Sequence, residues 1–153
     1  MYKIGGKKKM SDFDTGIGKT VGIYAIVLGL LYIGIGAAKI VLQVSGIGRV
    51  GVIPGNDALG GLFFFVIAAT YLTGVKGAVN GEYRGLSFLL GGFFLSLVYG
   101  IVYILIIGGN AVSYVLGEGD FLWFVQFTPS VWLFIIALPF GYLIGQITKD
   151  MSW

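Results

Sequence analysis

Residues 21–38 of the chain read VGIYAIVLGLLYIGIGAA, eighteen consecutive residues without a charged side chain. At about 1.5 Å per residue, an α-helix of this length crosses about 27 Å, close to the roughly 30 Å hydrocarbon core of a bilayer. Three further uncharged runs occupy residues 58–75, 85–117 and 121–148. The sequence therefore predicts an all-α integral membrane protein, built as a bundle of four transmembrane helices.

The composition and the connections support this architecture. Hydrophobic residues make up 57% of the 153 residues and charged residues only 11%, whereas roughly a quarter of the residues of a soluble domain are charged. We place the bundle at residues 20–148, with spans at about 20–44, 59–79, 86–108 and 130–147, between a polar tail (1–19) and a short end (149–153). A glycine-rich connection at residues 45–57 and an Asn80-Gly81 turn separate the first three spans, and the Gly108-Gly109-Asn110 cluster ends the third.

The connection before the fourth span has a different character. It carries Glu118 and Asp120 and then the aromatic sequence FLWFV at residues 121–125. Aromatic rings are favoured at membrane interfaces, so we expect residues 121–125 to lie in the interface. Thr128 and Pro129 are then expected to begin the fourth helix as its N-cap and its first-turn residue.

Basic residues are distributed unevenly among the predicted loops. With the N-terminus in the cytoplasm, eight of the ten Lys and Arg residues lie on the cytoplasmic side. They are Lys3, Lys7, Lys8, Lys9, Lys19, Lys76, Arg84 and Lys149. The positive-inside rule therefore predicts a multi-pass protein of the cytoplasmic membrane with both ends inside. We expect Lys7, Lys8 and Lys9 to contact anionic lipid headgroups rather than nucleic acid.

The chain contains no Cys and no His. These side chains are the usual ligands of zinc, iron–sulfur clusters and haem, and they supply most general bases and nucleophile pairs. We therefore expect no metal, no cofactor, no catalytic residue and no enzymatic activity of the chain by itself. An enzyme acting on lipids would have to use Asp57, Arg49, Glu82 or Arg84, and no pair of these has a diagnostic spacing.

Small residues recur at helical spacing in three of the four spans. The predicted helix-packing positions are Gly22, Gly29 and Gly36 in the first span, Gly92, Ser96 and Gly100 in the third, and Ala137, Gly141 and Gly145 in the fourth. Small residues four apart let helix backbones approach closely in lipid. Any one stripe is explained by packing within the bundle, but three stripes predict that at least one contacts another protein.

Lys39 is the only basic residue within the apolar body of the first span. The favoured interpretation is that its long stem extends to the outer headgroups. The alternative is a buried charge that faces the bundle near Tyr32 and Gly36, with Glu118 or Asp120 as its partner.

Hydroxyl groups also lie within the predicted spans, at Thr70, Tyr71 and Thr73 on the second and at Tyr99 and Tyr103 on the third. Such groups usually bond to a backbone carbonyl or a neighbouring helix, so we interpret them as packing groups rather than a substrate path. The spans contain no run of Asp, Glu or His that would indicate a proton relay, which disfavours a pump or secondary transporter.

One stretch of the first span, GLLYIGIGAAK at residues 29–39, resembles the first span of DoxX-type four-helix membrane proteins, in which a glycine followed by lysine closes the helix. The resemblance covers this one span and assigns no site residue.

Taken together, the small size, the missing ligand side chains and the small-residue faces favour a non-catalytic structural or accessory subunit of a larger membrane protein complex. Its partners would be other membrane protein subunits and lipids. The alternative is a small oligomeric channel or transporter, in which Glu118 and Asp120 would concentrate cations at a mouth.

Overall fold

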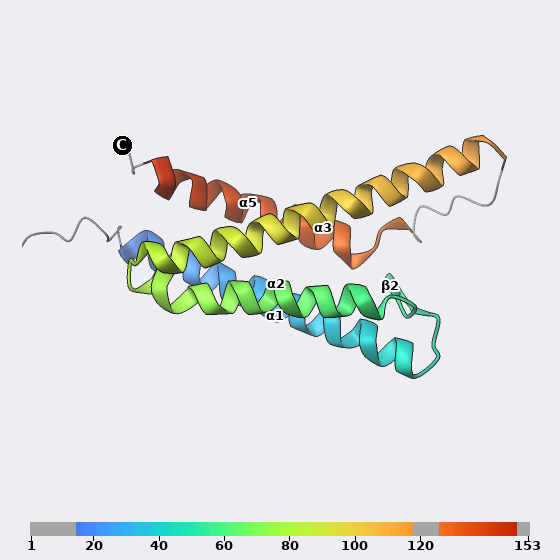
Figure 1. Ribbon diagram of the computed structural model, residues 1–153, viewed down its shortest axis with the longest axis horizontal. Coiled ribbons are helices and arrows are strands. Elements are labelled where there is room, and N and C mark those ends of the chain that lie inside the picture. The colour runs from blue at the N-terminus through green and yellow to red at the C-terminus, as the bar shows by residue number, and fades with distance from the viewer. Residues whose placement is uncertain (1–14, 118–125, 150–153) are drawn as a thin grey trace, which may run out of the picture.

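The computed structural model describes residues 15–117 and 126–149. They form four long helices, α1 (Thr15–Val44), α2 (Ala58–Val79), α3 (Tyr83–Val115) and α5 (Pro129–Lys149) (Figure 1). Each helix is long and apolar enough to cross a membrane. The predicted all-α bundle of four spans is therefore confirmed, whereas Lys7, Lys8, Lys9 and the aromatic segment at residues 121–125 lie outside the described residues.

Consecutive helices run in opposite directions and pack side by side in the order α1, α2, α3, α5, and α5 closes the ring against α1. The α1–α2 contact is the most extensive of the four. The start of α1, the α2–α3 turn and the end of α5 lie together at one end of the bundle, which we refer to as the terminal end (Figure 1). The α1–α2 connection lies at the opposite end, which we refer to as the loop end.

Glycines shape both described connections. The α1–α2 connection contains a small antiparallel pair of strands, β1 (Arg49–Val50) and β2 (Ile53–Pro54). Gly46 and Gly51 in this connection have φ values of 68° and 59°, and Gly81 in the α2–α3 turn has 77°. Side chains rarely tolerate this left-handed region, so glycine permits these turns. The Asn80-Gly81 turn was predicted at this place.

The largest difference from the prediction is the length of α3. The predicted span ended at Gly108, but the helix has 33 residues and continues to Val115. A glycine within a helix costs only about 1 kcal/mol, and a backbone in lipid gains from keeping its helical hydrogen bonds. The helix ends instead before Gly117, which has φ 82° and whose N–H donates to the Tyr114 carbonyl at 3.0 Å. Such a left-handed glycine is a common helix end.

The start of α5 also differs in detail from the prediction. Pro129 is its first residue, as expected. However, the buried hydroxyl of Thr128 has no hydrogen-bond partner within the described part of the chain. The carbonyl of Thr128 accepts the N–H of Val131 at 3.0 Å instead, so the predicted side-chain cap is replaced by a backbone turn.

Aromatic rings fill the interior in an unbroken series that we term the aromatic column. Successive ring centroids lie 5.0–6.1 Å apart, in the order Tyr24, Phe140, Tyr71, Tyr32, Phe64, Tyr99 and Tyr103. All four helices contribute to it. Each stacked or edge-on pair adds about 0.5–1.5 kcal/mol beyond the burial of its area. Hydroxyls bond across the bundle as well, because Tyr32 bonds to the buried Ser96 and Tyr24 donates to the Ile136 carbonyl at 2.7 Å.

Eight of the nine predicted packing positions face the inside of the bundle. Four of them lie against α2: Gly22, Gly29, Gly36 and Gly92. Gly100 lies against Phe134 and Gly141 against Phe93, and Ser96 and Ala137 are buried. At the closest point, a Cβ on Gly36 would lie 2.9 Å from the Gly61 carbonyl oxygen. A Cβ on Gly145 would meet nothing within 4 Å among the described residues. The three stripes therefore serve internal packing, and of the nine predicted positions Gly145 is the one without a close neighbour among the described residues.

The Gly36–Gly61 contact predicts a difference between two alanine variants of the same helix. Gly36→Ala places a Cβ against a backbone oxygen, so the helices must separate, and we expect a loss of about 1–3 kcal/mol in the free energy of unfolding. Gly34→Ala is the matched control because a Cβ there meets nothing within 4 Å. It should be neutral or stabilise by up to about 1 kcal/mol. Unfolding in mixed micelles measures both, and equal effects would contradict the close approach.

Candidate functional site: a buried ion pair that joins four helices

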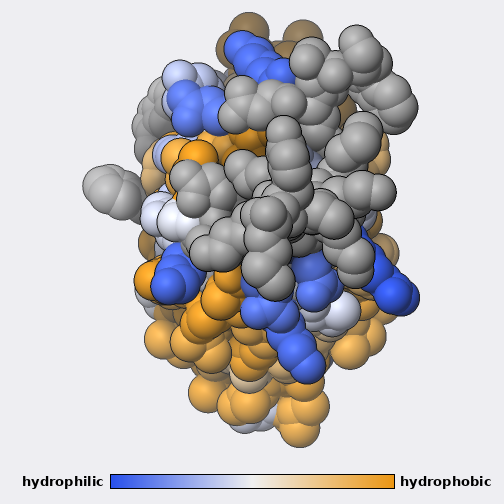
Figure 2. Space-filling view, turned by 90° about the vertical axis from the view of Figure 1, so that its left-hand side faces the viewer, coloured by the Kyte–Doolittle hydropathy of each residue, from blue (hydrophilic) through white to orange (hydrophobic). Residues whose placement is uncertain are grey.

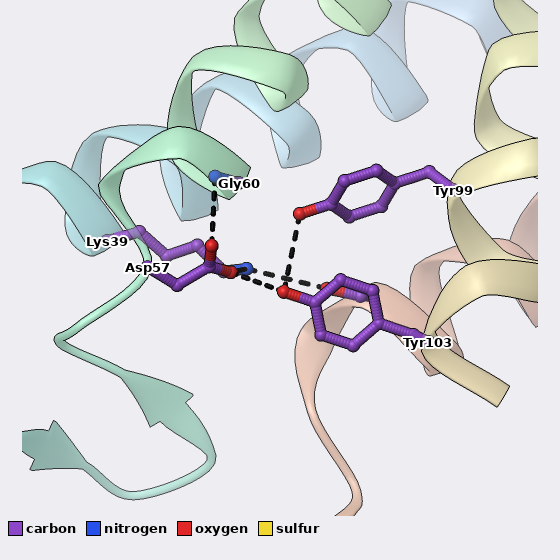
Figure 3. A network of polar contacts seen from close by, with 6 residues as sticks. Lys39, Asp57, Gly60, Tyr99 and Tyr103 are labelled. Carbon is purple, nitrogen blue, oxygen red and sulfur yellow. Dashed lines mark hydrogen bonds and ion pairs between the residues drawn. The ribbon is translucent and has the colours of Figure 1, made fainter. Parts of the chain in front are cut away.

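Lys39 lies inside the bundle near the loop end. Its side chain is 0% exposed, and its Nζ is 2.5 Å from Oδ2 of Asp57 (Figure 3). An unpaired ammonium in an apolar interior is costly, and a carboxylate at this distance offsets that cost. Of the two interpretations of Lys39, the structure shows the buried charge. Its partner is Asp57, whereas Glu118 and Asp120 lie outside the described residues.

The local sequence explains why Asp57 stands at this place. Asp57 is the N-cap of α2, and its Oδ1 accepts the N–H of Gly60 at 2.9 Å. Aspartate is among the most favourable residues for this position. Lys39 and Asp57 also lie at equal distances in sequence from residue 48, in the middle of the α1–α2 connection. Residues placed in this way face each other in an antiparallel helical hairpin.

The two remaining helices complete the site. From α3, the Tyr103 hydroxyl donates to Oδ2 of Asp57, and the Tyr99 hydroxyl donates to that of Tyr103 at 3.4 Å (Figure 3). From α5, the Ser130 hydroxyl accepts a hydrogen bond from Lys39 Nζ at 3.4 Å. We name these five residues, Lys39, Asp57, Tyr99, Tyr103 and Ser130, the four-helix cluster.

Aromatic rings surround the ammonium group on its other sides. Lys39 Nζ lies 4.6 Å from the ring centroid of Phe64 and 5.3 Å from that of Tyr103. A desolvated cation over a ring gains about 2 kcal/mol from the ring quadrupole. Phe64 and Tyr103 also belong to the aromatic column, so the column ends at the ion pair.

The environment of Asp57 keeps it ionised. Burial by itself raises the pKa of Asp57, but the hydrogen bonds from Lys39 and Tyr103 outweigh burial and hold this pKa below its usual value. Both carboxylate oxygens are engaged, Oδ1 by Gly60 and Oδ2 by Lys39 and Tyr103. The carboxylate therefore has little capacity left for a substrate, and the arrangement acts chemically as a clamp between helices.

The structure brings together some of the predicted residues and separates others. Lys39, Tyr99 and Tyr103 meet in the four-helix cluster. The Tyr103 hydroxyl bonds to the N-cap of another helix and the hydroxyls of Thr70 and Thr73 bond to backbone carbonyls, as predicted. The buried Tyr71 hydroxyl, in contrast, has no hydrogen-bond partner among the described residues. From the sequence, Asp57 is a candidate only for an enzyme acting on lipids, and Ser130 has no predicted role. The mirrored spacing of Lys39 and Asp57 about the connection was the available signal. Glu82 and Arg84 lie at the α2–α3 turn, at the other end of the bundle from Asp57 (Figure 1).

Removing the ammonium group should damage the bundle. Lys39→Leu leaves the Asp57 carboxylate, whose side chain is 23% exposed, without its counter-ion. Breaking a fully buried pair typically costs about 3–5 kcal/mol of stability, so we expect a loss of up to this size. Lys149→Leu, at an exposed position near the end of α5, should change stability by less than about 0.5 kcal/mol. Combining Lys39→Leu with Asp57→Asn should cost less than the sum of the single variants. A Lys39→Leu protein as stable as the Lys149→Leu control would contradict the burial of the charge.

The same variant should weaken the pH dependence of stability. In the natural sequence the pKa of Asp57 is lowered from 3.8, so its contribution is complete above about pH 4 and is lost as the pH falls through the folded-state value. Lys39→Leu removes the hydrogen bond and the charge of Lys39 that lower this pKa, while the burial that raises it stays. This variant should therefore lose less stability than the natural protein as the pH falls below about 4. Unfolding free energies measured from about pH 7 down to about pH 2 test this difference, and parallel profiles would contradict it.

Comparison with known proteins places this architecture in a family. A family model described as the MJ0565 integral membrane domain matches residues 16–147, which include all four helices except their outermost residues at α1 and α5. No curated protein and no solved structure matches the chain. The chain belongs to the MJ0565 integral membrane domain family.

Proposed function

We propose that this protein is a non-catalytic accessory subunit of a larger membrane protein complex, held in the cytoplasmic membrane with both ends in the cytoplasm. In this proposal the loop-end half of α3 is the surface that docks on another membrane protein subunit. The observation that carries the proposal is the apolar surface that this half of α3 leaves uncovered.

The exposure of α3 sets it apart from the other helices. In its most apolar stretch 17% of the residues are buried, compared with 33–39% in the other three helices. Among the described residues, Leu105 is 69% exposed and Val115 is 82% exposed, and Val112 lies between them with 60%. Figure 1 shows this part of α3 extending beyond the start of α2 and the start of α5. No described helix packs over it there.

The length of α3 makes this exposure costly. Its 33 residues correspond to about 50 Å, well above the roughly 30 Å of a hydrocarbon core. Even a tilt of about 40°, the upper end of the observed range, leaves about 38 Å along the membrane normal. The last turns of α3 would therefore place apolar side chains beyond the hydrocarbon, where a protein partner stabilises them better than water does.

Glycines on the same part of the helix suit a helical partner. A Cβ on Gly108 or Gly109 would meet nothing within 4 Å among the described residues. Two adjacent residues without side chains let the backbone of another helix approach closely. The small residues left open for a neighbour thus coincide with the uncovered apolar surface.

The interior of the bundle favours this role over that of a channel formed by one chain. The aromatic column runs through the centre, and the charges of Lys39 and Asp57 are used by each other. Conduction needs polar groups that face a water-filled path. A channel would then have to form between several copies, and ion flux into proteoliposomes that contain only this chain would reveal it.

Photo-crosslinking in native membranes tests the docking surface. A photoreactive residue at Val112 should give an adduct of one defined mass with another membrane protein, whereas one at Ile23, which is 64% exposed on α1, should give lipid adducts. Gly108→Leu should reduce both the Val112 adduct and co-purification of that protein several-fold, because it blocks the close approach. Lipid adducts alone at Val112, or no effect of Gly108→Leu, would contradict the proposal.

A further inference from the structure

A pocket lies at the α2–α3 turn, at the opposite end of the bundle from the four-helix cluster. It has a volume of about 450 Å³ and is lined among others by Thr73, Lys76, Glu82, Arg84 and Phe88. Gly77 and Gly85 form its base, because a Cβ on Gly77 would lie 2.6 Å from the Cα of Gly85. The two helices touch backbone to backbone there, and the longer side chains around this contact leave a hollow.

The charges at this pocket are not neutralised within the described part of the protein. Lys76 and Arg84 are exposed, and neither forms an ion pair with another described residue. Lys76 lies in the last turn of α2, where the helix dipole favours a cation. Arg84 lies in the first turn of α3, where the dipole disfavours one, so helix stability does not account for it. The pocket is therefore complementary to an anion.

The position of the pocket identifies the kind of anion. Hydrophilic side chains gather at the terminal end of the molecule, and apolar surface adjoins them (Figure 2). Within the pocket, Lys76 and Arg84 provide the charge, while Phe88, one turn further into α3, is 43% exposed and apolar. A basic pair beside an apolar ring at the end of membrane-spanning helices matches the boundary between phosphate groups and acyl chains.

We propose that this pocket binds an anionic phospholipid. Lys76 and Arg84 contact the phosphate oxygens, with the planar guanidinium of Arg84 suited to two parallel hydrogen bonds. The acyl chain lies along Phe88. The carboxylate of Glu82 also lines the pocket, so it repels a second negative charge and accepts hydrogen bonds. The pocket therefore favours a headgroup with one phosphodiester and hydrogen-bond donors, such as the hydroxyls of phosphatidylglycerol. The site is independent of the proposed accessory role.

Lipid binding to the purified full-length protein tests this inference. In a neutral detergent, native mass spectrometry counts bound phosphatidylglycerol, and phosphatidylcholine and inorganic phosphate serve as comparison ligands. The double variant Lys76→Gln/Arg84→Gln should weaken phosphatidylglycerol binding roughly thirtyfold, since each basic residue near a membrane surface contributes about fivefold. The matched control is Lys19→Gln/Lys149→Gln, which removes the same charge from the same end of the bundle on α1 and α5. It should leave binding nearly unchanged.

A gain of binding separates the inference from a failure to fold. Glu82→Gln removes the repelling carboxylate and should strengthen phosphatidylglycerol binding several-fold. The preference for headgroups that carry hydrogen-bond donors should become smaller. Equal losses in the two double variants, or weaker binding by Glu82→Gln, would overturn the site. Displacement of the lipid by millimolar inorganic phosphate would overturn the assignment to a lipid and indicate free phosphate as the ligand.

Discussion

An ammonium group in a low-dielectric interior is stable only beside an anion, and in this bundle Lys39 imposes that requirement on every helix. Asp57 supplies the charge from the N-cap of α2. Tyr103 of α3 and Ser130 of α5 supply the hydrogen bonds that the pair needs once water is excluded. The contacts of this one buried charge thus fix the positions of the four helices relative to one another along the membrane normal. Apolar contacts alone would leave the helices free to slide in lipid.

The ion pair in turn depends on how closely α1 and α2 approach. Gly36 and Gly61 meet backbone to backbone beside it, and a Cβ on Gly61 would lie 3.4 Å from the Cβ of Lys39. The absence of two side chains lets the two backbones meet beside Lys39, whose own side chain is 0% exposed. The aromatic column then carries this tight packing from the ion pair to the centre of the bundle, so polar and apolar contacts reinforce one another.

The number of helices and the nature of the connections could be predicted because they depend on local properties of the chain. Uncharged runs longer than about 18 residues have few alternatives to a membrane span, and Asn80-Gly81 marks a turn by itself. The end of α3 was placed wrongly because Gly108 and Gly109 weaken a helix only slightly, and the deciding residue was Gly117. The partner of Lys39 depends on which residues meet across the α1–α2 connection, which no single span encodes.

The distribution of charge and packing also bears on where function resides in this protein. At the centre, charged groups are paired and glycines are in contact with neighbouring helices, so substitutions there should act mainly through stability. At the surface, α3 exposes apolar side chains along its loop-end half, and the terminal end carries the unpaired Lys76 and Arg84 within the described residues. The surfaces proposed for interaction are these two regions, at opposite ends of the same helix. Because α3 is continuous between them, a partner at one end and a lipid at the other would both constrain its tilt.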